Sequence, residues 1–177
     1  MLDLVAISDK LCVLLSLLTM NAELREYRKL FQQMIQENDS GIIDNSSRAH
    51  AKVILQELVR SAKHEILIQC SRLAKDIYGD LETQRLLMNA LQNGIRVSIA
   101  IRDSIPETEC FCTDLDTRFP GTVHRHTSVL PLDFCVVDGK RFRLEKDKTL
   151  GTAFVCANNV NISSKLQAIY NSEIAAA

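Results

Sequence analysis

The sequence contains no tryptophan, and aromatic residues make up only 5% of its 177 positions. So few rings argue against a stacking platform for single-stranded nucleic acid. The formal net charge is −1, so the chain has no global basic field of the kind that attracts nucleic acid or anionic membranes. No glycine-rich phosphate-binding loop occurs anywhere in the chain. Any contact with phosphate must therefore come from a local group of residues.

The chain also lacks an apolar run long enough for a membrane. The most apolar stretch, Leu11 to Leu18, is far shorter than the roughly 20 residues that cross a bilayer. Asp3 and Asp9 make the preceding leader acidic, and Thr19–Ala22 is a poor cleavage site for a signal peptidase. We therefore expect a cytoplasmic chain with no membrane contact, rather than a secreted one with a processed leader.

The cysteines do not form the pattern of a disulfide framework. Cys70, Cys135 and Cys156 lie inside apolar, strand-like runs, where a free thiol behaves as a small hydrophobic group. This arrangement is typical of a reducing cytoplasm. We expect no cofactor.

The composition, 46% hydrophobic and 24% charged, is that of a globular protein with a real core. Apolar residues recur at helical spacing from Leu4 to Ile35, and a polar, turn-rich stretch follows over 37–47. We therefore predict a helical N-terminal segment with a linker over 1–45 and an α/β domain over 46–177. The first helix is apolar on more than one face, so its own domain or another subunit should cover it.

Within the second segment the apolar period alternates between helix and strand. Strands are predicted at Glu65–Cys70 and Ile95–Arg102, and the helical pattern between them makes a right-handed βαβ unit with parallel strands. Asp138-Gly139 predicts a hairpin turn between two further strands. The fold class is thus α/β, with a mixed β-sheet flanked by helices. The remaining elements are a helix capped by Ser46 or Ser47, a strand in "GTVHRHT", a strand in "GTAFVCAN" and a helix over 161–171.

From Ser61 onward the order of elements resembles the phospholipase D superfamily. The resemblance covers about two thirds of the chain, and one such unit matches the family's small nucleases, which pair two units across a dimer interface. It implies a catalytic His-x-Lys-x(4)-Asp pattern in which histidines act on phosphorus and lysines hold phosphate oxygens. The segments that carry it are "SAKHEILIQC", "LLMNALQNGIRVSIAIR", "FCVVDGKRF" and "GTAFVCANNVNISSKLQAIYN".

Only one position of that pattern matches. If Asp138 is the acid of the motif, the lysine position holds Asp133 and the histidine position holds Pro131. Proline has no nucleophilic nitrogen. A carboxylate in place of the cation reverses an interaction of about 4 kcal/mol for charges about 4 Å apart at an effective dielectric constant near 20. We therefore expect a catalytically inactive module, with a phosphodiester repelled at this position.

Two other features imitate or replace the motif. The stretch "HAKVILQE" reads His-x-Lys-x(4)-Glu, but its helical period keeps His50, Lys52 and Glu57 from projecting together as they would from a strand. Alternatively, a divergent phosphodiesterase or nuclease could have relocated its histidine to His124 or His126.

A group of cysteines and histidines could form a metal site or a nucleophilic pair, or could have no chemical role. Cys110, Cys112, His124 and His126 offer four zinc-type ligands, but their spacing is unlike common zinc sites, and the preferred interpretation is no metal. One cysteine could instead pair with His126 as a nucleophile, although no local signature supports this.

A basic cluster from Lys140 to Lys148, including Arg141 and Arg143, could contact phosphate in a non-catalytic nucleic-acid binder, or could be a solvated face. The leading hypothesis remains an inactive phospholipase D-like module with a regulatory role. It would act through protein–protein interaction, as a homodimer or larger assembly or with a protein partner that the sequence does not identify.

Overall fold

The computed structural model describes residues 22–103, 106–126 and 131–175. The predicted apolar helix over residues 4–18 lies outside these ranges. A helix over residues 22–37 comes first, and we call it the N-terminal helix. It is followed by β1 (Ile42–Asn45), α2 (Arg48–Ser61), β2 (Glu65–Arg72), α3 (Lys75–Tyr78), α4 (Leu81–Gln92), β3 (Arg96–Asp103), α5 (Pro106–Arg118), β4 (Val123–Arg125), β5 (Phe134–Val137), β6 (Arg141–Asp147), β7 (Thr152–Cys156) and α6 (Val160–Ala175).

The strands form one mixed sheet in the order β1-β7-β6-β5-β2-β3-β4. β2 pairs in parallel with β3, and β3 with β4, as the predicted βαβ unit requires. β5 pairs antiparallel with β2 and with β6. The carboxyl ends of β2 and β3 and the start of β5 therefore lie along the same edge of the sheet. This mixed α/β architecture confirms the predicted fold class.

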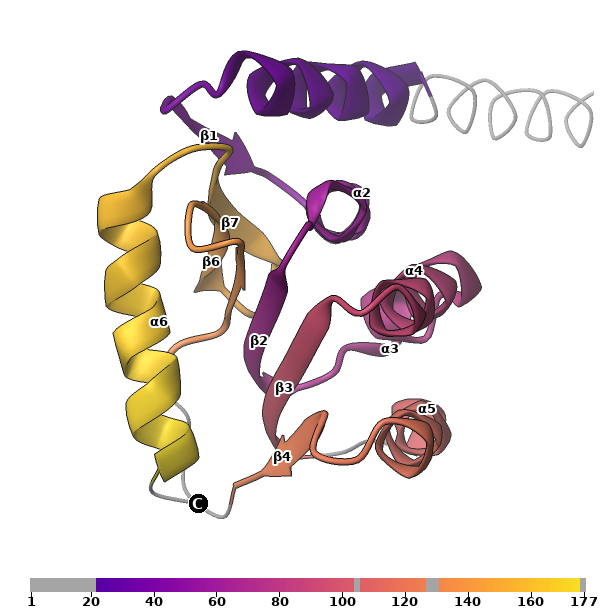
Figure 1. Ribbon diagram of the computed structural model, residues 1–177. Helices are drawn as coiled ribbons and strands as arrows, with labels where there is room; N and C mark the ends of the chain where they lie inside the picture. Colours follow the sequence, from indigo (N-terminus) through magenta and orange to yellow (C-terminus); the bar gives the residue numbers. More distant parts are fainter. Residues whose placement is uncertain (1–21, 104–105, 127–130, 176–177) are drawn as a thin grey trace, which may run out of the picture.

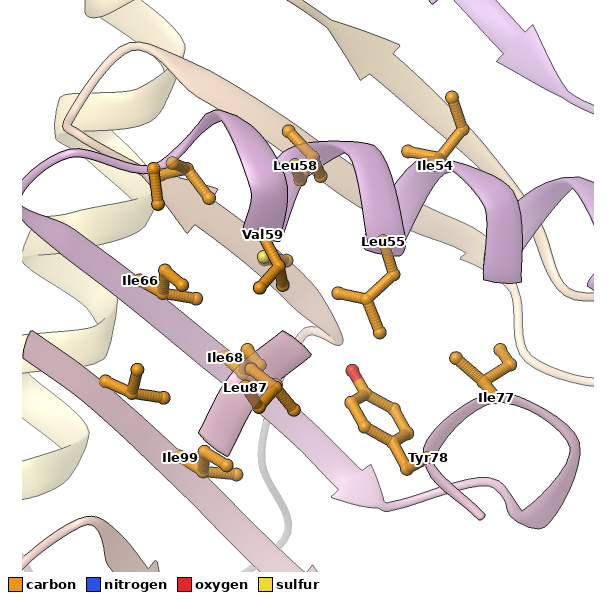
Figure 2. Close-up of a cluster of buried hydrophobic side chains, with 14 of the residues drawn as sticks. Ile54, Leu55, Leu58, Val59, Ile66, Ile68, Ile77, Tyr78, Leu87 and Ile99 are labelled. Atoms are coloured by element: carbon orange, nitrogen blue, oxygen red, sulfur yellow. The ribbon is translucent and has the colours of Figure 1, made fainter. Parts of the chain in front are cut away.

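Helices cover both faces of this sheet, with α6 on one face and α2 to α5 on the other (Figure 1). The side chains of β2 alternate between the two cores: Ile66 and Ile68 face α2, whereas Leu67 packs with residues of α6. On the α2 side, Val59 points toward Ile68 and Leu87, and Leu55 points toward Tyr78 (Figure 2). Two hydrophobic cores thus fix the sheet between its helical layers.

Local signals place the helices as expected. The Ser47 hydroxyl caps α2 by accepting a hydrogen bond from the His50 amide at 3.2 Å. The imitation of the catalytic motif lies on this helix: the His50 ring packs on Tyr27 with ring centroids 4.2 Å apart, while Lys52 pairs with Asp80 at 3.3 Å. His50 and Lys52 therefore serve different contacts, as the helical period predicted.

Two expectations need correction. The stretch over 37–47, predicted as a linker, contains the edge strand β1, which pairs with β7. No helix or strand was predicted around Cys110, where the structure has the helix α5. Phe31 and Met34 of the N-terminal helix lie in the same core cluster as α2, so the described part of the predicted N-terminal segment shares the core of the α/β domain. Among the described helices, none combines the length and the apolar character needed to cross a lipid bilayer.

Candidate functional site

The hairpin formed by β5 and β6 has the predicted turn. Asp138 and Gly139 both have positive φ, 51° and 63°, the pattern of a type I′ turn. The Lys140 amide donates to the Val137 carbonyl at 3.2 Å and closes the turn. An acid and a glycine stand here because both tolerate this left-handed backbone.

Asp138 has a structural task at this turn. Its carboxylate accepts hydrogen bonds from the backbone amides of Lys63, His64 and Glu65 at 2.9 to 3.2 Å. It also pairs with the buried guanidinium of Arg141 at 3.2 Å. These donors satisfy both oxygens, so Asp138 anchors the hairpin to the beginning of β2.

Asp133 lies at the other end of β5, about 17 Å from Asp138 if five residues advance at the usual strand rise. It is buried, and its Oδ1 accepts from the Ser71 amide at 3.0 Å and the Ser71 hydroxyl at 3.1 Å. The Lys148 ammonium lies 2.9 Å from the same oxygen and 2.6 Å from the Ser71 hydroxyl. The Asp133 carboxylate is therefore held in a fixed, charge-compensated network.

Asp133 borders a cleft of about 430 Å³ at the carboxyl ends of β2 and β3, the edge where open α/β sheets bind ligands. A smaller inner chamber of about 40 Å³ shares Asp133, Arg72 and Glu145 with it and is also lined by Arg143. No histidine is among the described residues that line either space. The cleft is lined by Arg48, Ser71, Arg72, Ala74, Ile77, Arg102, Asp133, Glu145, Lys148 and Gly151.

The charge of this cleft differs from the expectation based on Asp133 alone. Four lining side chains are cationic and two are acidic, so the formal excess is two positive charges. Lys148 compensates Asp133, and Arg143 lies 3.2 Å from Glu145. The predicted repulsion of an anion therefore does not follow for the cleft as a whole, because cations from other elements surround the acid.

Arg48 fixes the wall of the cleft that carries Lys148. Its guanidinium donates to the Lys148 and Thr149 carbonyls at 3.1 and 3.4 Å and pairs with Asp76 at 3.0 Å. Gly151 has φ +69°, and a Cβ there would lie 2.6 Å from Arg48 Cγ, so only glycine allows the loop to lie this close to α2. The cleft is thus a preorganised feature of the fold.

The predicted basic cluster does not form a single patch. Arg141 and Arg143 are buried, paired with Asp138 and Glu145 respectively. The half-buried Lys140 lies at the turn, whereas Lys148 lies beyond the other end of β6, a strand about 20 Å long at the usual rise per residue. Only Lys148 of this cluster lines the cleft.

The two candidate histidines lie at the far edge of the sheet. His124 Nε2 and the Ser98 hydroxyl are joined by a hydrogen bond of 2.9 Å. The Tyr170 hydroxyl donates to the same Ser98 hydroxyl at 2.7 Å. Burial and the neighbouring His126 lower the pKa of His124, although Asp116 opposes the shift. His126 is buried, and three strand spacings separate β4 from β5, which puts it about 14 Å from Asp133.

The cysteines and histidines are not gathered around a metal position. Cys110 is exposed and Cys112 is buried on α5, since residues two apart on a helix project in different directions. Within the described ranges no group of three potential ligands could hold a metal ion. Burial raises the pKa of the Cys112 thiol to about 11, which keeps it protonated near neutral pH and opposes a nucleophilic role.

The residues that sequence reasoning missed are Arg48, Ser71, Arg72 and Arg102. They come from α2, β2 and β3, far from the hairpin in sequence. Arg72 and Arg102 had a usable signal, because each follows an apolar strand in a parallel pair, and the carboxyl ends of such strands meet at one edge.

No protein-family model matches the chain, and no curated protein matches it in sequence. Among solved structures, NucT from Helicobacter pylori superposes with a TM-score of 0.60 at 12% identity, over 77% of this chain and 97% of its own. The phospholipase D family member Nuc from Salmonella typhimurium gives 0.55 at 17% identity, over 76% and 94%.

A third neighbour, TrmBL2, is an archaeal chromatin protein whose structure is described as showing a novel mode of DNA binding. Its TM-score is 0.59 at 13% identity, over 94% of this chain. The chain spans 64% of the length of TrmBL2.

Proposed function

We propose that this chain, which has the phospholipase D-like fold, is a catalytically inactive module that acts by binding. The observation that carries the proposal is the environment of Asp133. Where an active member would present a phosphate-binding lysine, this chain has a buried carboxylate whose hydrogen bonds and ion pair are already made with Ser71 and Lys148. Exposed Pro131 occupies the histidine position and supplies no imidazole.

Self-association is the mode of binding that the fold favours. The edge strand β1 pairs only with β7 among the described strands. Its Asp44 carbonyl accepts a hydrogen bond from the Tyr27 hydroxyl of the N-terminal helix at 3.1 Å, and no strand pairs with the rest of this edge in the described part of the chain. Ile42 on this strand is 50% exposed, and Phe154 on its neighbour is 42% exposed. An apolar, unpaired edge of this kind is a surface that a second copy could cover.

Light scattering of the purified protein tests the proposed self-association. We expect a dimer or a larger assembly at micromolar concentration, because obligate homodimers commonly bury upwards of about 2,000 Å². Replacing Ile42 with lysine should shift the assembly toward monomer, whereas the same change at exposed Leu81 on α4 should not. A wild-type protein that stays monomeric over this range contradicts the proposal.

Nucleic-acid binding is the second candidate function, supported by the fold shared with TrmBL2 and by the cations of the cleft. Arg72 and Lys148, rather than buried Arg141 and Arg143, are then the phosphate contacts. A relocated nuclease site has less support, since neither His124 nor His126 is among the described residues that line the cleft or its inner chamber.

A further inference from the structure

We infer that the cleft at the carboxyl ends of β2 and β3 binds a phosphomonoester dianion through cations that lie outside the degenerate motif. The inference rests on the proposed absence of hydrolysis at this site. Neither Pro131 nor Asp133 supplies positive charge, so the binding groups must come from elsewhere. The structure provides them on separate elements: Arg48 on α2, Arg72 on β2 and Lys148 after β6.

Arg72 is the central group of this site. It follows the buried residues of β2, its side chain is exposed, and within the described ranges no ion pair or hydrogen bond of its guanidinium is found. Arg48 and Lys148, by contrast, are held in position by Asp76 and Asp133. An uncommitted guanidinium beside two fixed cations can form a bidentate contact with phosphate oxygens without breaking an existing pair.

The inner chamber adds an independent observation. Arg143 is 9% exposed and lines this chamber, and its Nε has no hydrogen-bond partner among the described residues, although its Nη2 donates to the Gly151 carbonyl at 3.1 Å. A buried donor of this kind is costly unless an acceptor reaches it. An oxygen of the ligand, or a water that the ligand orders, would satisfy Arg143 from the cleft side.

The charge and size of the cleft select the class of ligand. Its formal excess of two positive charges complements a dianion better than the single charge of a phosphodiester. A volume of about 430 Å³ falls within the range of small-molecule sites and exceeds what a bare phosphate fills. Several cations around one position also favour phosphate, which offers three terminal oxygens, over a carboxylate with two.

Calorimetric titration of the full-length protein with phenyl phosphate at pH 8 tests the inference. At this pH the phosphate carries close to two charges, since its second pKa is near 6. We expect saturable binding, and binding at least about fivefold weaker for diphenyl phosphate and for benzoate, which carry one charge. Arg72→Gln should weaken phenyl phosphate binding about tenfold, the scale of one charge-assisted contact.

The matched control is Arg25→Gln, which removes an exposed arginine from the N-terminal helix and should change the affinity less than about twofold. Oligonucleotides with and without a 5′-phosphate identify the source of the ligand. Tighter binding of the phosphorylated form indicates a polynucleotide end, and equal binding indicates a small molecule.

Absence of binding at millimolar phenyl phosphate, equal losses in both arginine variants, or equal affinity for benzoate would each overturn the inference. Release of phenol from diphenyl phosphate would instead contradict the proposed lack of catalysis and leave the binding site standing. The two failures are therefore distinguishable.

Discussion

At the scale of single residues, the two acids of the hairpin have separate tasks. Asp138 binds the backbone at the start of β2, and Asp133 binds Ser71 at the end of that strand. The sequence predicted the turn at Asp138, because an Asp-Gly dipeptide reports a local backbone conformation. It could not predict Lys148 beside Asp133, because that contact depends on how a separate loop folds back over the sheet.

Replacing Asp138 by alanine tests its anchoring role. Three backbone amides and the buried Arg141 would lose their acceptor, so we expect a loss of about 3 kcal/mol in the free energy of unfolding. Asp138→Asn keeps one acceptor oxygen and tolerates the positive φ, and should lose about half as much. Urea denaturation measures both. A loss below about 0.5 kcal/mol in the free energy of unfolding of the alanine variant would contradict the anchoring role of Asp138.

At the scale of elements, period and turn signals predicted the strands of the βαβ unit, the hairpin and the final helix. Three elements were not predicted: the four-residue helix α3, the strand β1 and the helix α5. The last two were missed for physical reasons. β1 has only four residues within a polar stretch, and its stability comes from pairing with β7. In α5, buried Phe111, Cys112 and Leu115 are set among polar residues, so the helical period is weak. The formation of β1 and of α5 depends on tertiary contacts, which cannot be inferred from a single sequence.

The cap of α4 yields a pH-dependent prediction. Asp80 accepts from the Thr83 amide at 3.1 Å and from Gln56 Nε2 of α2 at 3.1 Å. Burial alone would raise the pKa of Asp80, but the hydrogen bonds from Thr83 and Lys52 lower it below the usual 3.8. A lowered pKa in the folded state means that the charged cap stabilises the fold above the unfolded-state pKa, and that this stabilisation disappears as pH falls through the folded-state value.

We therefore expect Asp80→Ala to cost about 1–2 kcal/mol at pH 7. The difference from wild type should shrink as the pH is lowered below 3.8. Thermal unfolding across this range measures it. Asp114→Ala, which removes an exposed carboxylate paired with Arg118 on α5, serves as the control and should change little at any pH. If the difference in stability between Asp80→Ala and wild type does not change with pH, the charge of Asp80 does not contribute to stability.

At the scale of the whole molecule, the cleft is assembled from α2, β2, α3, β3, the start of β5, β6 and the loop after β6. The resemblance predicted the fold, and the structural neighbours confirm it. That the motif positions of this fold lack their catalytic groups stays a prediction of the sequence alignment. The charge of the site was not predictable from the motif, because three of its four cations are more than 25 residues away from Asp133 in sequence and the fourth follows it by 15.

The lack of phosphodiester hydrolysis is the claim that this account depends on most. It is tested by incubating the purified wild-type protein, in molar excess, with a chromogenic phosphodiester and with single- and double-stranded DNA and RNA, with and without chelator, from pH 5 to pH 9. We predict product formation no faster than in buffer alone. Hydrolysis above that background, abolished by His126→Ala but unaffected by changes at an unrelated surface residue, would show a working active site and contradict the account.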